Sequence, residues 1–425
     1  MESTEQNTKD FPPGPKGWPL VGNIIELARN EKPASVVFTE YAKEYGNIFS
    51  IRVGKRWAVV LNGAATIKEA LLKKGVEFAN RTTSYTTDLF TEGGQDIAFG
   101  QYSPSWKLHR KLAFSAFRKL ATGDNKRFEK LVYSIIPALT ANLDSKLSEP
   151  FDPHTSLSSS IYNILASLCF GKQYEFDDPQ LTRLIYLSKE ADKLAGSGSL
   201  ADFIPIFKYV PTPGQRKLEA VWKEFLGFIS QELEEHREKY DGGFHRDALT
   251  VSTRIKDEGK EDMNLITETR IRQTVTDVFT AGTDTSIFTL QWCVGLMVQY
   301  PEVQAKVAEE VDRVVGRDRL PSLDDRGELV YTPQQPCTRL CGHFLDESGK
   351  VRLHPEGFMP FSTGRRVCIG ESVAKAELFL IFAWLFQHYK FSKPIGQEEK
   401  DFSEGNPQPA VNMMKDIEVV VEKRF

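Results

Sequence analysis

The chain has 425 residues, of which 40% are hydrophobic and 26% are charged. This balance is typical of a globular protein and excludes a disordered chain. The 54 basic and 58 acidic residues give a net charge of −4, so nothing in the overall charge points to a nucleic-acid partner. The five cysteines are odd in number and scattered, which argues against a disulfide scaffold and fits a reducing compartment better.

The first ten residues, 1–10, are polar, and we expect an N-terminal tail without an apolar signal region. The longest apolar run, Leu378–Phe386, has nine residues, whereas a helix that spans a bilayer needs about 20. We therefore expect no transmembrane anchor in this chain, although it could lie on a membrane surface. No repeat or linker interrupts 11–425, and we predict a single domain there.

Local patterns predict the elements of the first half in chain order. Four prolines and three glycines in 11–23 predict a stiff, extended arm. Apolar spacing then predicts a helix over 34–45, a hairpin over 48–61, and helices over 66–73, 105–120, 126–147, 156–170 and 215–240. The apolar, proline-rich interval 201–214 is either a buried loop or an exposed loop that touches a membrane or gates a pocket.

The second half is predicted to be mainly helical as well. A helix over 267–299 is apolar around much of its circumference, which indicates burial in the middle of the protein. Further helices are expected over 301–315 and 371–388, and the end of the tail 391–425 alternates like a strand. The predicted fold class is mainly α with small β-sheets.

One cysteine, Cys368, stands directly before a predicted helix, where the helix dipole stabilises a thiolate. Gly364 and Gly370 let the backbone turn and approach a flat ligand. Arg366 could pair with an anionic group of that ligand, and Phe361 could shield the sulfur from water. An isolated cysteine is usually an inert core thiol, but a dry thiolate in this setting can ligate haem iron and favour O–O cleavage.

The sequence FSTGRRVCIG around this cysteine resembles the haem-binding signature of the cytochrome P450 family, Phe-x-x-Gly-x-Arg-x-Cys-x-Gly, at all five specified positions. The closer similarity is to microsomal members that oxidise steroids and xenobiotics. The resemblance implies a P450-like fold, haem b (iron protoporphyrin) ligated by Cys368, and monooxygenation of a lipophilic substrate by dioxygen. It also implies an NADPH-dependent flavoprotein reductase as electron donor. The implied location is the cytosolic face of the endoplasmic reticulum membrane, or a peripheral or cytoplasmic one without an anchor.

Two other segments resemble the same family in the same order. In WKLHR, the resemblance makes Trp106 and Arg110 partners of the haem propionates, together with Arg366; alone, this pentapeptide would be a solvated helix face. AGTDTS resembles the oxygen-activation motif, in which Asp284 and Thr285 would deliver protons. The alternative for AGTDTS is a helix kink with a polar core pair. The candidate substrate residues are Ile97, Phe99, Phe203 and Ala281.

The Glu-x-x-Arg helix of the family is absent from its expected place. Between 319–332 and 343–350 stands only Pro333–Gly342, whose two prolines oppose a helix. Glu310–Arg313 has the right spacing, but it lies in an earlier predicted helix and is interpreted as a solvated pair. We predict a missing block near 331–343, which makes the fold internally truncated. The alternative function is therefore a catalytically impaired or inactive isoform that retains little or no haem.

Two cysteines flank this junction. Cys337 and Cys341, with His343 close by, provide three of the four ligands that a structural zinc site requires, and no second cluster supplies a fourth. A novel junction in the chain is the favoured interpretation.

Overall fold

The computed structural model describes residues 11–19, 21–30, 32–54, 56–122, 125–196, 199–203, 205–238, 265–329, 357–403, 405–407 and 412–425. The polar tail 1–10 and the junction with Cys337, Cys341 and His343 lie outside the described residues.

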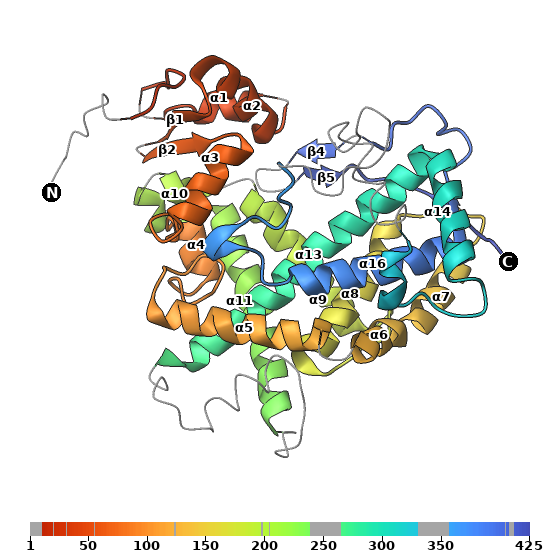
Figure 1. Ribbon diagram of the computed structural model, residues 1–425. Helices are drawn as coiled ribbons and strands as arrows, with labels where there is room; N and C mark the ends of the chain where they lie inside the picture. Colours follow the sequence, from red (N-terminus) through yellow and green to blue (C-terminus); the bar gives the residue numbers. More distant parts are fainter. Residues whose placement is uncertain are drawn as a thin grey trace.

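The N-terminal part forms its own group of elements, at the upper left of Figure 1. It contains α1 (Ile24–Arg29), α2 (Ala34–Tyr45), β1 (Ile48–Val53), β2 (Arg56–Leu61), α3 (Ala64–Lys68) and the π-helix η2 (Glu69–Lys73). The predicted hairpin is confirmed, because β1 and β2 pair antiparallel with Ile48 opposite Leu61. The proline-rich arm lies along this hairpin: the rings of Phe11 and Trp57 stack at 4.9 Å.

The rest of the described chain is mainly helical with two further small sheets, so the predicted fold class is confirmed. The helices are α4 (Tyr85–Phe90), α5 (Pro104–Thr122), α6 (Asn125–Ser134), α7 (Ile136–Asp144), α8 (Pro153–Phe170), α9 (Pro179–Gly196), α10 (Leu200–Phe203), η3 (Pro205–Lys208), α11 (Pro213–Glu238), α13 (Glu268–Gln299), α14 (Pro301–Val314), η5 (Leu323–Gly327), η7 (Gly364–Arg366) and α16 (Glu371–His388). The strands are β3 (Tyr389–Ser392), β4 (Gly405–Pro407), β5 (Asn412–Met414) and β6 (Val420–Lys423). As predicted, the chain ends in a strand: β6 pairs antiparallel with β3.

Two predictions about the helices were wrong. The segment 126–147 forms two helices, because Pro137 in the first turn of α7 has no N–H to continue the ladder of α6. The helix α9 was not predicted at all. The interval 201–214 begins in α10 with the buried Ala201 and then becomes exposed at Tyr209 and Val210.

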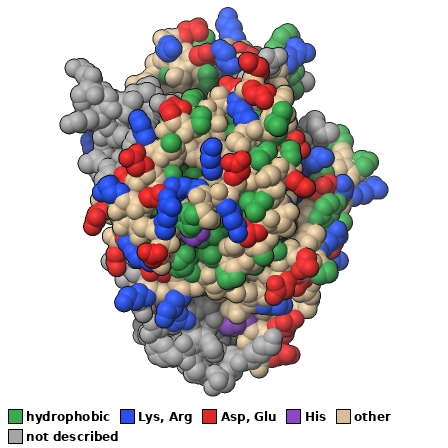
Figure 2. Space-filling model, turned by 90° about the vertical axis from the view of Figure 1, so that its right-hand side faces the viewer, with side chains coloured by type: hydrophobic (Ala, Val, Ile, Leu, Met, Phe, Trp, Pro, Cys, Tyr) green, Lys and Arg blue, Asp and Glu red, His purple; other side chains and the backbone are tan. Residues whose placement is uncertain are grey.

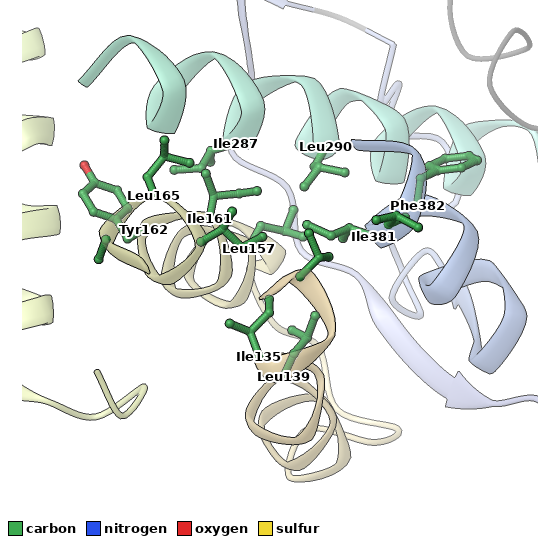
Figure 3. Close-up of a cluster of buried hydrophobic side chains, with 14 of the residues drawn as sticks. Ile135, Leu139, Leu157, Ile161, Tyr162, Leu165, Ile287, Leu290, Ile381 and Phe382 are labelled. Atoms are coloured by element: carbon green, nitrogen blue, oxygen red, sulfur yellow. The ribbon is translucent and has the colours of Figure 1, made fainter. Parts of the chain in front are cut away.

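The core is organised around α13, which crosses the middle of the molecule and packs against both α8 and α16 (Figure 1). Figure 3 shows Leu157, Ile161 and Leu165 of α8 facing Ile287 and Leu290 of α13, and all five side chains are buried. Full burial of one such side chain stabilises the fold by about 1.5–3 kcal/mol. This packing fixes the rotation of α13 about its axis and therefore decides which way the residues of AGTDTS point.

The surface carries charges of both signs. On the face shown in Figure 2, lysine and arginine side chains alternate with aspartate and glutamate, and apolar side chains lie between them. Among the described helices, none is both long enough and apolar enough to span a bilayer.

Candidate functional site

The cysteine loop is built by two close approaches of the backbone. Gly364 has a φ of +79°, and a Cβ at this position would collide with the carbonyl oxygen of Leu71. Only glycine combines this conformation with this contact at low cost. The N–H of Cys368 then donates to the carbonyl of Phe361 at 2.9 Å, which closes the turn.

The loop delivers Cys368 to the N-terminus of α16, as the sequence predicted. Gly370 precedes the first turn of α16, and a Cβ there would lie 3.9 Å from the sulfur of Cys368. The thiol is exposed, and Phe361 beside it is half-buried. The N–H groups of the first turn of a helix have no partner within the helix, and Cys368 stands directly before these groups of α16.

Trp106 on α5 holds two arginines together over its ring. The guanidinium carbon of Arg366 lies 4.0 Å from the ring centre and that of Arg110 lies 5.3 Å from it. Arg110 also donates to the carbonyl of Val367, next to the cysteine. The structure thus brings Trp106, Arg110 and Arg366 to the cysteine loop, although they come from segments about 260 residues apart.

A third arginine, Arg81, joins this cluster and was missed by the sequence analysis. Burial, with the positive charges of Arg81 and Arg110, lowers the pKa of Arg366 to about 10. Burial and Arg81 likewise lower the pKa of Arg110, while Cys368 acts in the opposite direction. Among the described residues, no carboxylate forms an ion pair with any of the three arginines. We name Arg81, Arg110 and Arg366 the arginine cluster.

The side chains of Arg366 and Trp106 donate to backbone carbonyls in this structure. Arg366 donates to the carbonyls of Ala79 at 2.7 Å and Gly100 at 2.7 Å, and the indole N–H of Trp106 donates to the carbonyl of Ile97 at 2.9 Å. These groups therefore hold the backbone in this structure. The negative charge of Asp96 opposes the positive charges around Arg366 only in part, because no carboxylate among the described residues pairs with the cluster. A ligand with two carboxylates, such as haem, would neutralise the remaining positive charge.

AGTDTS lies in the centre of α13, but its residues face different sides. Thr285 and Ala281 are exposed on one side, where the hydroxyl of Thr285 donates to the carbonyl of Ala281 at 2.6 Å. Asp284 faces α9 instead, and the hydroxyl of Ser188 donates to its Oδ2 at 3.4 Å. Adjacent residues of a helix point about 100° apart, so the side chains of Asp284 and Thr285 leave α13 on different faces.

The small residues of this motif also have separate roles. Gly282 packs against α8, because a Cβ would lie 2.8 Å from a methyl carbon of Leu165. The absence of a side chain at Gly282 therefore serves the contact between α13 and α8.

The candidate substrate residues come from three segments of the chain. Ile97 is only 5% exposed, and its backbone N–H donates to Asp277 on α13 at 2.7 Å, which anchors its loop to this helix. Phe99 is exposed, as is Ala281. The side chain of Phe203 lies outside the described part of the structure.

Taken together, the fold and the site define a mainly helical protein in which a cysteine at a helix start lies beside an arginine cluster that no carboxylate of the described residues pairs with. The sequence profile of the family described as cytochrome P450 matches residues 12–335 and 340–419. The chain belongs to the cytochrome P450 family.

Individual relatives agree with this assignment. The chain is 29% identical over 442 aligned positions to steroid 17-alpha-hydroxylase/17,20 lyase of Squalus acanthias, covering 90% of this chain and 86% of that enzyme. It is 31% identical to cytochrome P450 1A1 of Oryctolagus cuniculus, with 90% and 86% covered. Among solved structures, a zebra fish cytochrome P450 with progesterone superimposes with a TM-score of 0.79 at 26% identity, covering 92% of this chain and 99% of that one.

These findings show that the fold is that of a cytochrome P450 and that the chain is a haem-dependent monooxygenase by lineage, acting on lipophilic substrates. They favour this function over the alternative of a catalytically impaired isoform. Family membership also implies a redox partner and the use of dioxygen.

Proposed function

We propose that the chain binds haem b through the thiolate of Cys368 and inserts one atom of dioxygen into a steroid-like or xenobiotic substrate. One observation carries the proposal: an arginine cluster with no ion pair among the described residues lies against the loop that places Cys368 at the start of α16. A flat, dianionic cofactor such as haem would neutralise the charge of the arginine cluster and bind the sulfur of Cys368. Bound haem would supply the iron that activates dioxygen.

The residues of this chain would divide the remaining tasks. Arg81, Arg110 and Arg366 would hold the propionates, while Gly364 and Gly370 keep the loop close to the cofactor. Thr285, whose hydroxyl lies on the exposed side of α13, would hold a proton at Oγ1 for the reaction. Asp284 would act from the neighbouring side of the helix.

The electron donor that we propose is an NADPH-dependent flavoprotein reductase, because the sequence has no dinucleotide or flavin motif of its own. The proposed location is the cytosolic face of the endoplasmic reticulum membrane. Two exposed apolar sites support peripheral contact with a membrane: Trp18 is 60% exposed, and Tyr209 is 82% exposed.

We also propose that 11–425 is one domain from which a block near 331–343 is missing. The family match is interrupted between 335 and 340, and the alignment with the Squalus acanthias enzyme is longer than this chain, so that relative carries residues without a counterpart here. Glu310–Arg313, which has the Glu-x-x-Arg spacing, lies in α14, where Arg313 is exposed. Its place supports the interpretation as a surface pair.

The absorption spectrum of the reduced protein under carbon monoxide tests the proposed function. We expect a thiolate-type Soret shift in the wild type and its loss in Cys368→Ser. Cys293→Ser, on α13, is the matched control and should keep the shift. A wild-type protein that binds no haem, or a Cys368→Ser variant with an unchanged spectrum, would contradict the proposal.

A further inference from the structure

Two carboxyl groups meet where α9 crosses α13. Asp284 of α13 accepts a hydrogen bond from Ser188 of α9. Asp192 lies one helical turn beyond Ser188 on the same face and is within hydrogen-bonding reach of Asp284. Two like charges are thus brought together by two different helices.

Two lysines of α9, Lys189 and Lys193, lie nearest to Asp192 along the chain. In the described part of the structure, neither these lysines nor any other lysine or arginine forms an ion pair with Asp192 or Asp284. Farther along the helices, Arg183 pairs with Glu224 and Lys217 pairs with Glu190. From α8, the hydroxyl of Tyr162 interacts with Ser188 and Thr283, and burial raises its pKa, so it stays neutral.

The two carboxyl groups differ in their access to water. Burial, with the neighbouring charge of Asp192, raises the pKa of Asp284 to about 8, so Asp284 holds a proton at neutral pH. Asp192 reaches the surface, and the partial burial of its carboxyl raises its pKa only to about 6. We therefore assign the retained proton to Asp284 and the exchange with solvent to Asp192.

The place of Asp284 in the sequence links the pair to the proposed reaction site. Thr285 follows it directly and presents its hydroxyl on the exposed side of α13. A proton on Asp284 is therefore held one residue away from the Thr285 hydroxyl. The contact of Asp284 with α9 keeps this proton away from the exposed side of α13.

We propose that Asp192 is a positioning residue that reloads Asp284 with protons from water during the proposed monooxygenase reaction, on which this inference rests. In each transfer, the O–H bond of the Asp192 carboxyl breaks and an O–H bond forms on the Asp284 carboxylate. A hydronium ion of the solvent then gives its proton to the Asp192 carboxylate and becomes water. The transfer needs no oxidant or reductant.

Infrared spectroscopy of the haem-loaded protein with ¹³C-labelled aspartate carboxyl groups tests the pair without turnover. We expect the wild type to show protonated-carboxyl absorption at neutral pH, with a component that is absent in Asp284→Asn. In Asp192→Asn this component should titrate at a pH lower by about one unit, because the repelling charge is gone. Identical spectra in the three proteins would overturn the proposal. Should Asp192→Asn fail to fold, Ser188→Ala reports on the same carboxyl.

The pH profile of substrate oxidation with excess reductase tests the relay itself. We expect Asp192→Asn to lower turnover about tenfold at neutral pH with an unchanged KM, and Asp192→Glu to restore it. Glu190→Gln, a charge loss on the same helix, is the matched control and should behave like the wild type. Equal turnover in Asp192→Asn and the control would overturn the relay. An inactive wild type with an intact infrared component would instead reject the proposed function alone.

Discussion

Ser286 of α13 donates a hydrogen bond to Oε1 of Glu377 on α16, in the buried contact between the central helix and the helix that begins after the Cys368 loop. Glu377 is 1% exposed, and its Oε2 has no hydrogen-bond partner among the described residues. Burial raises the pKa of Glu377 to about 8. The carboxyl is therefore neutral at physiological pH, and its ionisation would place an uncompensated charge in the core.

Replacing Glu377 by glutamine should remove a pH dependence of stability. Because its pKa is higher in the folded than in the unfolded state, the folded state binds the proton more tightly between about pH 4 and about pH 8. The free energy of unfolding should therefore fall as pH rises through this window. Urea unfolding should show a loss of about 2 kcal/mol between about pH 6 and about pH 8 that is smaller in Glu377→Gln. The same loss in both proteins would contradict this prediction.

Substitutions in the arginine cluster should separate the effect on haem retention from the effect on folding. Arg81 makes one long bond to the carbonyl of Ala98, at 3.4 Å, whereas Arg366 satisfies several backbone carbonyls. We expect Arg81→Gln to lower haem retention about tenfold with little effect on unfolding, since it removes charge alone. Arg366→Gln should also lower the free energy of unfolding by about 2 kcal/mol, because it leaves buried carbonyls without donors.

Haem transfer to an acceptor protein and denaturant unfolding measure these two effects. Arg365→Gln, next to Arg366 in the chain but exposed, is the control and should leave both unchanged. The prediction is wrong if Arg81→Gln and the control lose haem at the same rate.

The cysteine loop should not tolerate a side chain at Gly364. A Cβ there meets the carbonyl of Leu71, and the φ of +79° is strained for any other residue. We expect Gly364→Ala to destabilise the protein by about 1–3 kcal/mol and to weaken the thiolate-type spectrum. Gly357→Ala is the matched control, because nothing lies within 4 Å of its added Cβ. Calorimetry measures the melting temperatures of both variants. Equal melting temperatures would show that the added Cβ of Gly364→Ala does not collide with the carbonyl of Leu71.

The sequence predicted those features whose residues lie close together in the chain. Helical periodicity located α13 and α16, and the spacing around Cys368 identified the loop, because glycine, arginine and cysteine act there within ten residues. Arg81 could not be found in this way, since the arginine cluster joins residues distant in sequence. For α9, a signal was present in Leu181, Leu184 and Leu187, which recur at intervals of three and are all buried.

The direction of side chains on α13 was the harder problem. The sequence motif alone suggests that Asp284 and Thr285 act at one point, but in a helix neighbouring side chains point about 100° apart. Which of the two residues faces the exposed side of α13 depends on how this helix packs. The contact of Gly282 with Leu165 fixes the rotation of α13 about its axis. That contact lies between two helices and leaves no trace in the sequence of either one alone.

Asp277 should hold the loop that precedes α5. Its Oδ2 accepts the N–H groups of Ile97 at 2.7 Å and Ala98 at 3.0 Å, and the loop therefore depends on one side chain of α13. We expect Asp277→Ala to leave two N–H groups without an acceptor and to lower the free energy of unfolding by about 1–3 kcal/mol. Asp277→Asn keeps an acceptor oxygen and is the matched control. Hydrogen exchange at Ile97 and Ala98 should accelerate in Asp277→Ala but much less in Asp277→Asn, and equal protection in both variants would show that other contacts fix the loop.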